Sequence, residues 1–176
     1  MMASDHHDRP APFGPDGLEL KRAFGSFATG VCVVTTTRPD GRPIGLTVNS
    51  LSSVSLQPPL LLWCLNKRSP NLVAFRDARV HAVSILAEHQ HALAQQFGRA
   101  SDDKFEGVAV RAGPHGVPLL CDAIATFECE NLQHHDGGDH LIFVARVLQF
   151  DVDLETHAPL VCHRSRFVRI APAALP

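Results

Sequence analysis

A nine-residue stretch, Thr47–Ser55 (TVNSLSSVS), holds four serines, a threonine and an asparagine between two apolar segments. A core strand does not need so many hydroxyl groups, and a plain surface loop does not need the three apolar residues among them. Hydroxyl groups and free backbone amides suit a ligand rich in hydrogen-bond acceptors, such as a phosphate, a ribityl chain or a heterocyclic dione. The alternative is a turn whose Ser and Thr side chains satisfy their own backbone. Residue types alone leave both interpretations open.

The alternation of apolar and polar residues breaks inside this stretch. Apolar residues occupy even positions up to Val48, Leu51 falls on an odd position, and Val54 and Leu56 return to even ones. Such a change of phase indicates a bulge or bend, which redirects side chains and frees backbone N–H groups. We therefore expect the chain to bend near Ser50.

A second polar cluster, residues 133–141 (QHHDGGDHL), holds three histidines and two aspartates around two glycines. Histidine and carboxylate groups are ligands of zinc and iron, but the i, i+4 spacing that places two ligands on one helix face is missing. A solvated hairpin loop is another interpretation. We favour a loop that presents one imidazole, that of His140, to a ligand, because the glycines before it allow a close backbone approach or a positive φ. No metal site is predicted.

Two further segments suit an anionic ligand with a flat ring. Ser69 is predicted to cap a short helix whose first residue is Pro70, and a helix N-terminus favours anions. Lys104 can bind a phosphate, and Phe105 can stack on a ring. Taken singly, a solvated lysine and a core phenylalanine are the default interpretation of these last two residues.

Length and composition argue against several classes of protein. The 176 residues fit one ordinary domain, and a hydrophobic fraction of 45% is typical of a globular chain. A net charge of −2 with no basic run gives no support to nucleic-acid binding, and the longest apolar run, residues 60–65, is too short to span a bilayer. The Gly-x-Gly-x-x-Gly, Walker A and Gly-x-Ser-x-Gly motifs do not occur in the sequence, so a Rossmann site, a P-loop or a serine hydrolase has little support.

Five cysteines form no C-x-x-C pair, and four of them lie in apolar, strand-like runs. We therefore expect buried, reduced thiols in a cytoplasmic protein. Residues 1–17, rich in Pro, Gly and Asp and without an apolar h-region, are expected to be a flexible tail rather than a signal peptide. Residues 18–176 are expected to form a single domain.

The expected elements favour a mainly β fold. Helices are predicted at residues 18–27, 70–75 and 87–98, and strands at 30–36, 43–50, 58–66, 79–86, 107–112, 123–132, 140–152 and 164–170. The nearly continuous apolar segment 58–66 is expected to be buried on both faces. Because the helices are few and do not alternate regularly with strands, an antiparallel barrel is favoured over a doubly wound parallel sheet.

Taken together, these segments resemble the flavin reductase-like family of FMN-binding split-barrel proteins over about residues 20–170. The most specific match is GLTVNSLSSVSLQPPLL, residues 45–61, which is similar to the family's main flavin-binding signature. The shorter matches are CLNKRSPN (64–71), DKF (103–105) and the Gly-Asp-His strand GDHLIFVARV (138–147). The closing segment departs from the family pattern, with Cys162 where an aromatic residue is common and Phe167 where a tyrosine is frequent.

The resemblance implies a six-stranded antiparallel Greek-key split barrel, mainly β, with a few short helices. It also implies hydride transfer from NADH or NADPH to FMN or FAD, with His140 contacting the nicotinamide nucleotide. The implied assembly is a homodimer, and the implied partner is a monooxygenase that receives the reduced flavin. Alternatives are a flavin-binding protein without efficient turnover and an FMN-dependent reductase of another small acceptor. The flavin-binding positions that the resemblance implies are Thr47, Asn49, Ser50, Ser52, Ser53, Cys64, Asn66, Ser69, Asn71, Lys104 and Phe105.

Phosphate contacts are expected from Ser69 and nearby backbone amides, because a helix N-terminus attracts anions. Asn71 and Lys104 are the expected supporting donors. Arg68 is a competing candidate, with a solvated side chain as its alternative.

Overall fold

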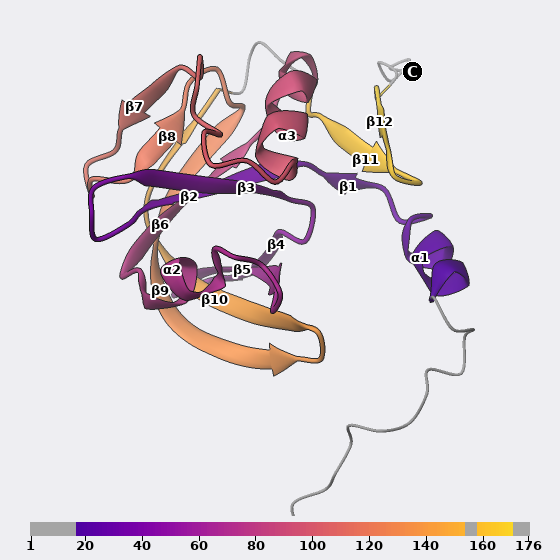
Figure 1. Cartoon of the computed structure of the whole chain (residues 1–176), viewed down its shortest axis with the longest axis horizontal. Coiled ribbons are helices and arrows are strands. Elements are labelled where there is room, and N and C mark those ends of the chain that lie inside the picture. The colour runs from indigo at the N-terminus through magenta and orange to yellow at the C-terminus, as the bar shows by residue number, and fades with distance from the viewer. Residues whose placement is uncertain (1–16, 154–157, 171–176) are drawn as a thin grey trace, which may run out of the picture.

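Seven antiparallel strands form the main sheet of the computed structural model, which describes residues 17–153 and 158–170 (Figure 1). Although β3 and β5 are separated by four strands in the order across this sheet, they contact each other, so the sheet curls towards a barrel. The strands in order are β3 (Pro43–Val48), β2 (Cys32–Thr37), β6 (Val80–Ile85), β9 (Ala125–Gly137), β10 (His140–Val152), β5 (Pro59–Asn66) and β4 (Ser52–Leu56).

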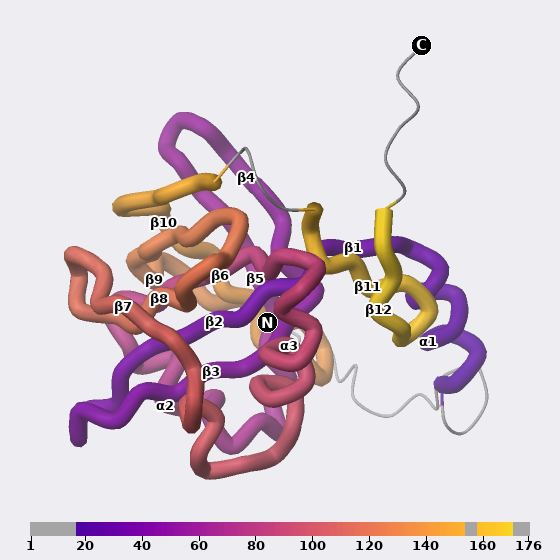
Figure 2. The backbone as a smooth tube through the Cα atoms, turned by 90° about the horizontal axis from the view of Figure 1, so that it is seen from above, coloured from indigo at the N-terminus to yellow at the C-terminus, as the bar shows by residue number. Residues whose placement is uncertain are grey.

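Two smaller sheets and a few short helices complete the described part of the chain. Figure 2 shows α1, β1, β11 and β12 grouped to one side of the main sheet. The small sheets are β1 (Thr29–Gly30) with β11 (Val161–His163) and β12 (Arg166–Val168), and the hairpin of β7 (Val110–Ala112) with β8 (Pro118–Leu120). The helices are α1 (Leu18–Phe24), α2 (Leu72–Asp77), the 3-10 turn η1 (Glu88–Gln90) and α3 (His91–Gly98).

The predicted mainly β, antiparallel fold with few short helices is confirmed, with seven strands in the main sheet where six were expected. The bend predicted near Ser50 is also confirmed. β3 and β4 lie at opposite edges of the sheet, and residues 49–51 join them directly. The alternation breaks there because the chain leaves one edge of the sheet and joins the other.

The first core cluster surrounds Trp63 of β5. Its ring stacks on Phe143 at a centroid distance of 4.2 Å and meets Phe75 edge-on at 5.5 Å. The indole N–H donates to Nε2 of His81 at 3.0 Å. Complete burial lowers the pKa of His81 to about 3, which keeps the imidazole neutral and able to accept this bond.

The strand β5 is buried on one face only. Leu61, Trp63 and Leu65 are in the core, whereas the residues between them are half-buried. The prediction that residues 58–66 are buried on both faces is therefore wrong. The rest of the described chain covers the second face only in part.

The strand β2, in contrast, has both faces buried. Val34 packs into the Trp63 cluster, and Val33 packs into a second cluster with Leu86 of the segment after β6 and Phe97 of α3. Phe97 is completely buried at the end of α3, so its packing in the core anchors the start of the loop that follows the helix.

Some predicted elements differ in extent. The strand predicted at 164–170 is confined to β12, and it follows a turn from β11 in which Arg164 and Ser165 have φ of 49° and 60°. The strand predicted at 107–112 is confined to β7. The predicted tail lies outside the described residues, apart from Gly17. Among the described residues, no helix has the length and apolar character needed to cross a membrane.

Candidate functional site

The hydroxyl of Ser50 fastens the bend between β3 and β4 to β5. Its Oγ accepts the backbone N–H of Cys64 at 2.9 Å and donates to the carbonyl of the same residue at 3.3 Å. Because β4 pairs with β5 only as far as Leu62, this side chain takes the place of a neighbouring strand at Cys64. Burial raises the pKa of the Cys64 thiol, and the hydrogen bond with Ser50 acts in the opposite direction.

The other polar residues of the bend divide into two kinds. Oγ1 of Thr47 donates to the carbonyl of Ala94 at 2.7 Å and so ties β3 to α3. Asn49, Ser52 and Ser53 are exposed, and the Ser52 hydroxyl makes a long 3.3 Å bond to the carbonyl of Ser53. Both interpretations of this segment therefore apply: some hydroxyls support the backbone, and others are open to a ligand.

The loop after β5 turns tightly before α2 begins. The carbonyl of Asn66 accepts the N–H of Ser69 at 2.9 Å, and the Ser69 hydroxyl accepts the N–H of Asn71 at 3.3 Å. The helix starts after Asn71, which occupies the N-cap position. The prediction that Ser69 caps the helix and Pro70 begins it is therefore wrong, because the Ser69 hydroxyl closes a separate local turn ahead of the helix.

His140 begins β10 directly opposite Asn66 of β5. Its Nδ1 lies 2.8 Å from Oδ1 of Asp139, and this hydrogen bond holds the pKa of Asp139 below its usual value. The hairpin is fastened to the loop after β5 by the 2.6 Å ion pair of Lys67 with Asp136. With Asp139 at Nδ1, the Nε2 atom is the nitrogen that His140 can offer to a ligand.

The histidine cluster lies in the hairpin of β9 and β10. The ring of His134 meets Phe143 edge-on at 4.7 Å, and burial lowers the pKa of His134. Across residues 17–153 and 158–170, no group of three or more His, Cys, Asp or Glu side chains is placed to hold a metal ion. The geometry therefore adds no support to the metal interpretation.

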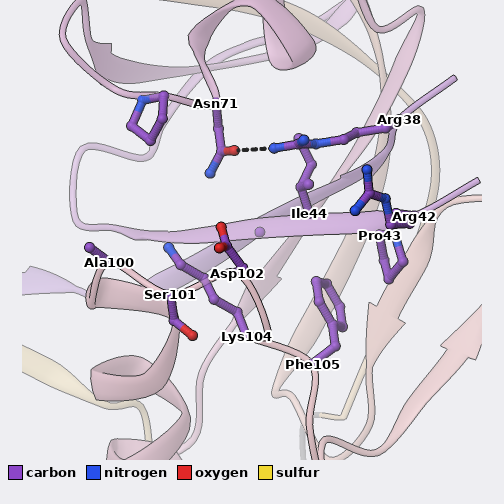
Figure 3. Close-up of a pocket in the computed structure, with 12 residues that line it drawn as sticks. Arg38, Arg42, Pro43, Ile44, Asn71, Ala100, Ser101, Asp102, Lys104 and Phe105 are labelled. Carbon is purple, nitrogen blue, oxygen red and sulfur yellow. Dashed lines mark hydrogen bonds between the residues drawn. The ribbon is translucent and has the colours of Figure 1, made fainter. Parts of the chain in front are cut away.

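A cavity of about 320 Å³ opens between the β2–β3 hairpin, the loop before α2 and the loop after α3 (Figure 3). Three of the predicted flavin-binding residues, Asn71, Lys104 and Phe105, line it. Its full lining is Arg38, Arg42, Pro43, Ile44, Gly45, Pro70, Asn71, Ala100, Ser101, Asp102, Lys104 and Phe105.

The end of α3 holds Lys104 and Phe105 at this cavity. Nζ of Lys104 donates to the carbonyl of Phe97 at 2.9 Å, and burial lowers the pKa of this lysine. The ring of Phe105 meets that of Phe97 edge-on at 5.0 Å. The Gln96 amide donates to the carbonyls of Lys104 and Glu106 at 3.0 and 2.9 Å. The cation is thus held by one hydrogen bond to the end of α3, and the Gln96 amide fixes the backbone of the loop that carries it.

Arg38 and Arg42 also line the cavity, and neither is among the site residues predicted from the sequence. The available signal is the turn sequence RPDGR, residues 38–42, which carries an arginine at each end of the connection between the strands predicted at 30–36 and 43–50. Nη2 of Arg38 donates to Oδ1 of Asn71 at 2.9 Å, and Nε of Arg38 is buried without a partner among the described residues. With Lys104, these groups make the lining rich in donors and cations, which fits a phosphate.

The predicted site residues therefore fall into two groups connected by the loop of residues 66–71. The cavity group is Asn71, Lys104 and Phe105. The second group lies along the β3–β4 bend, the end of β5 with its loop, and the start of β10, outside the lining of the cavity: Thr47, Asn49, Ser50, Ser52, Ser53, Cys64, Asn66, Ser69 and His140.

Comparison with known proteins gives consistent matches. The family described as "Flavin reductase like domain" matches residues 24–171. The reductase component of the flavin-dependent trigonelline monooxygenase of Acinetobacter baylyi is 46% identical over 132 residues, covering 75% of this chain and 43% of that protein. FMN reductase (NADH) SmoA of Agrobacterium fabrum is 43% identical over 141 residues, 78% of each chain.

Solved structures show the same fold. The NADH:FAD oxidoreductase SgcE6 of Streptomyces globisporus, in complex with NAD and FAD fragments, aligns with a TM-score of 0.86 and 37% identity over 90% of this chain and 95% of that one. The chain spans less than half the length of two of its relatives, 44% and 43%. The family match covers nearly all of the described residues. Three predicted flavin segments also lie together in the fold: the polar bend, the loop after β5 and the Gly-Asp-His hairpin. The chain therefore belongs to the flavin reductase-like family.

Proposed function

We propose that this chain is an NAD(P)H:flavin oxidoreductase, which transfers hydride from a nicotinamide nucleotide to FMN or FAD. The observation that carries the proposal is the cavity whose lining includes the hydrogen-bond donors of Arg38, Asn71 and Lys104. Such a donor set fits the phosphate groups of a flavin nucleotide. The names of the relatives as flavin reductases support the same reaction.

The residues present would hold a flavin through both groups. Asn71, Lys104 and the Ser69 hydroxyl would bind its phosphate, and Phe105 offers an aromatic surface to its ring. Bound flavin supplies the ring that accepts hydride, so the protein needs no nucleophile of its own. The exposed polar bend at residues 49–53 would stabilise negative charge on the ring through N–H and O–H donors.

His140 is the residue that we assign to the nicotinamide nucleotide. It lies beside Asn66, and Asp139 orients its ring by occupying Nδ1. A contact from Nε2 would position the nicotinamide for transfer, and positioning is a large part of what a hydride-transfer enzyme contributes.

Turnover with free flavin tests the proposal directly. Purified protein is mixed with FMN or FAD and with NADH or NADPH, and the absorbance of the reduced nicotinamide is followed. We expect flavin-dependent loss of that absorbance. Protein that binds flavin without oxidising either nicotinamide would be a flavin-binding protein, the first alternative. Oxidation that proceeds on a tightly held FMN, and only after another small acceptor is added, would identify the second alternative.

A homodimer is part of the proposal. The half-buried second face of β5 adjoins β4, where Val54 and Leu56 are 48% and 90% exposed. A second copy that covered this face would bury apolar surface that one chain leaves in water. Sedimentation at micromolar concentration checks this, and a clean monomer would contradict it.

A partner monooxygenase is the proposed recipient of the reduced flavin. Relatives named as reductase components of two-component monooxygenases support this role. We also propose a cytoplasmic location, which agrees with the five cysteines all being free thiols.

A further inference from the structure

Arg38 is a cavity cation that forms no ion pair with a carboxylate of the described residues. Its partner in the described chain is the neutral amide oxygen of Asn71, 2.9 Å from Nη2. Nε of Arg38 is buried and lacks a hydrogen-bond partner among the same residues. Asp40 attracts Arg38 only through longer-range charge interaction. The guanidinium therefore keeps donors and charge available for a ligand.

The other two cations of the lining are already engaged. Arg42 binds the Asp40 carboxylate through Nη2 at 2.7 Å and Nε at 2.8 Å, and Asp102 of the opposite loop attracts it as well. Lys104 gives a hydrogen bond to the end of α3. In Figure 3, Arg38 and Asn71 lie on one side of the ribbon that carries Ile44, and Lys104 lies on the other.

The bond from Arg38 also orients the Asn71 amide. Because Oδ1 of Asn71 accepts from Arg38, its nitrogen points away from Arg38 (Figure 3) and remains a donor. The cavity thus offers two adjacent donor groups, an amide and a guanidinium, only one hydrogen bond apart. The two phosphates of a pyrophosphate share a bridging oxygen, so they are neighbours as these two donor groups are. A guanidinium binds phosphate oxygens through two parallel N–H donors.

We infer that Arg38 is a specificity-determining residue, which binds the second phosphate of FAD beside the phosphate held by Asn71 and Lys104, and so favours FAD over FMN. This inference rests on the proposed function, since it assigns the first phosphate to the same cavity. FMN has a single phosphate, so it would leave Arg38 with its protein partner only.

The test is an equilibrium titration of FMN and FAD, followed by flavin fluorescence, with the wild type, Arg38→Ala and Arg38→Lys. We expect Arg38→Ala to raise the Kd for FAD at least about tenfold more than the Kd for FMN, the scale of one lost charge-assisted hydrogen bond. The Kd for FMN should rise only through the lost orientation of the Asn71 amide. Arg38→Lys keeps the charge without the fork, so its loss should be smaller. The control is Arg79→Ala, which removes an arginine that is 88% exposed and should change neither Kd.

Equal losses for FMN and FAD would overturn the inference, because Arg38 would then act on the shared phosphate or only through Asn71. An unchanged Kd for FAD would overturn it too. So would an effect confined to the KM for NADPH relative to NADH, which would place a different phosphate at Arg38. A wild type that binds and reduces neither flavin would instead refute the proposed function itself. The Arg38→Lys variant keeps the test decisive if Arg38→Ala does not fold.

Discussion

Ser50 and Cys64 are joined by two hydrogen bonds, of 2.9 and 3.3 Å, at the point where β4 no longer accompanies β5. A side chain there satisfies backbone groups that a strand would otherwise pair. Ser50→Ala should therefore lower the free energy of unfolding by about 1–2 kcal/mol, since it leaves a part-buried amide without its partner. Urea denaturation of the flavin-free protein measures this. Ser52→Ala, at an exposed hydroxyl, should stay within about 0.5 kcal/mol of the wild type, and an equal loss there would contradict the assignment.

Gly45 lines the cavity, and a side chain at this position would collide with the core. A Cβ there would lie 2.6 Å from a ring carbon of Phe97, the residue that supports Lys104 and Phe105. Gly45→Ala should therefore cost about 1–3 kcal/mol of stability through overpacking and also weaken flavin binding. Thermal unfolding and flavin titration measure the two effects. Gly30→Ala is the matched control, because a Cβ at Gly30 meets nothing within 4 Å. A stable Gly45→Ala protein with normal flavin affinity would refute the prediction.

The buried His81 predicts an acid dependence of stability. Burial places its folded-state pKa at about 3, below the value of about 6.5 in an unfolded chain. The unfolded state therefore takes up the proton first, so this contribution is complete above about pH 6.5 and is lost as the pH falls, by about 1.4 kcal/mol per unit. His81→Gln should flatten the decline between about pH 6.5 and pH 5 by about 2 kcal/mol. Urea denaturation across that range checks it, and an identical slope in the variant would count against the neutral buried imidazole.

Ser69 is the expected phosphate ligand that lies just outside the cavity lining. Its hydroxyl accepts one long hydrogen bond, from the N–H of Asn71, and its own proton remains to be donated. Ser69→Ala should weaken flavin binding by about 1 kcal/mol or somewhat more. Flavin titration beside Ser26→Ala, which removes a hydroxyl bonded within the α1 region, provides the comparison. An unchanged Kd in Ser69→Ala would exclude the contact.

His140 should act on the nicotinamide nucleotide and not on the flavin. His140→Ala is expected to raise the KM for NADH, with a lower kcat if positioning suffers, while the flavin Kd stays unchanged. His135→Ala removes an exposed imidazole from the same hairpin and should leave the kinetics unchanged. If both parameters of His140→Ala stay within about twofold, less than ~0.5 kcal/mol, the assigned role is wrong. Stoichiometric metal in the purified wild type, with activity lost to a chelator, would favour the metal interpretation instead.

The local pattern of apolar and polar residues was sufficient to predict much of this fold and part of the site. Strands such as β2 and β6 are rich in β-branched residues, and the apolar spacing of α3 marks its buried face, so neighbouring residues alone predict them. The start of α2 was misplaced because Ser69 suits both a helix cap and a local turn, and residue type does not distinguish the two.

Hydrophobic periodicity and turn chemistry are properties of near neighbours, so the antiparallel β class, the bend at Ser50 and the segments that carry the polar residues follow from the order of the residues alone. Which of those residues meet depends on the packing of elements that are far apart in the chain. Arg38 bonds Asn71, 33 positions away, and both line one cavity with Lys104 because the β2–β3 hairpin and the loop after α3 pack around the same space. The packing of β5 against the bend also joins the Ser50 hydroxyl to Cys64. Such pairings depend on how distant elements pack, and no short stretch of residues encodes them.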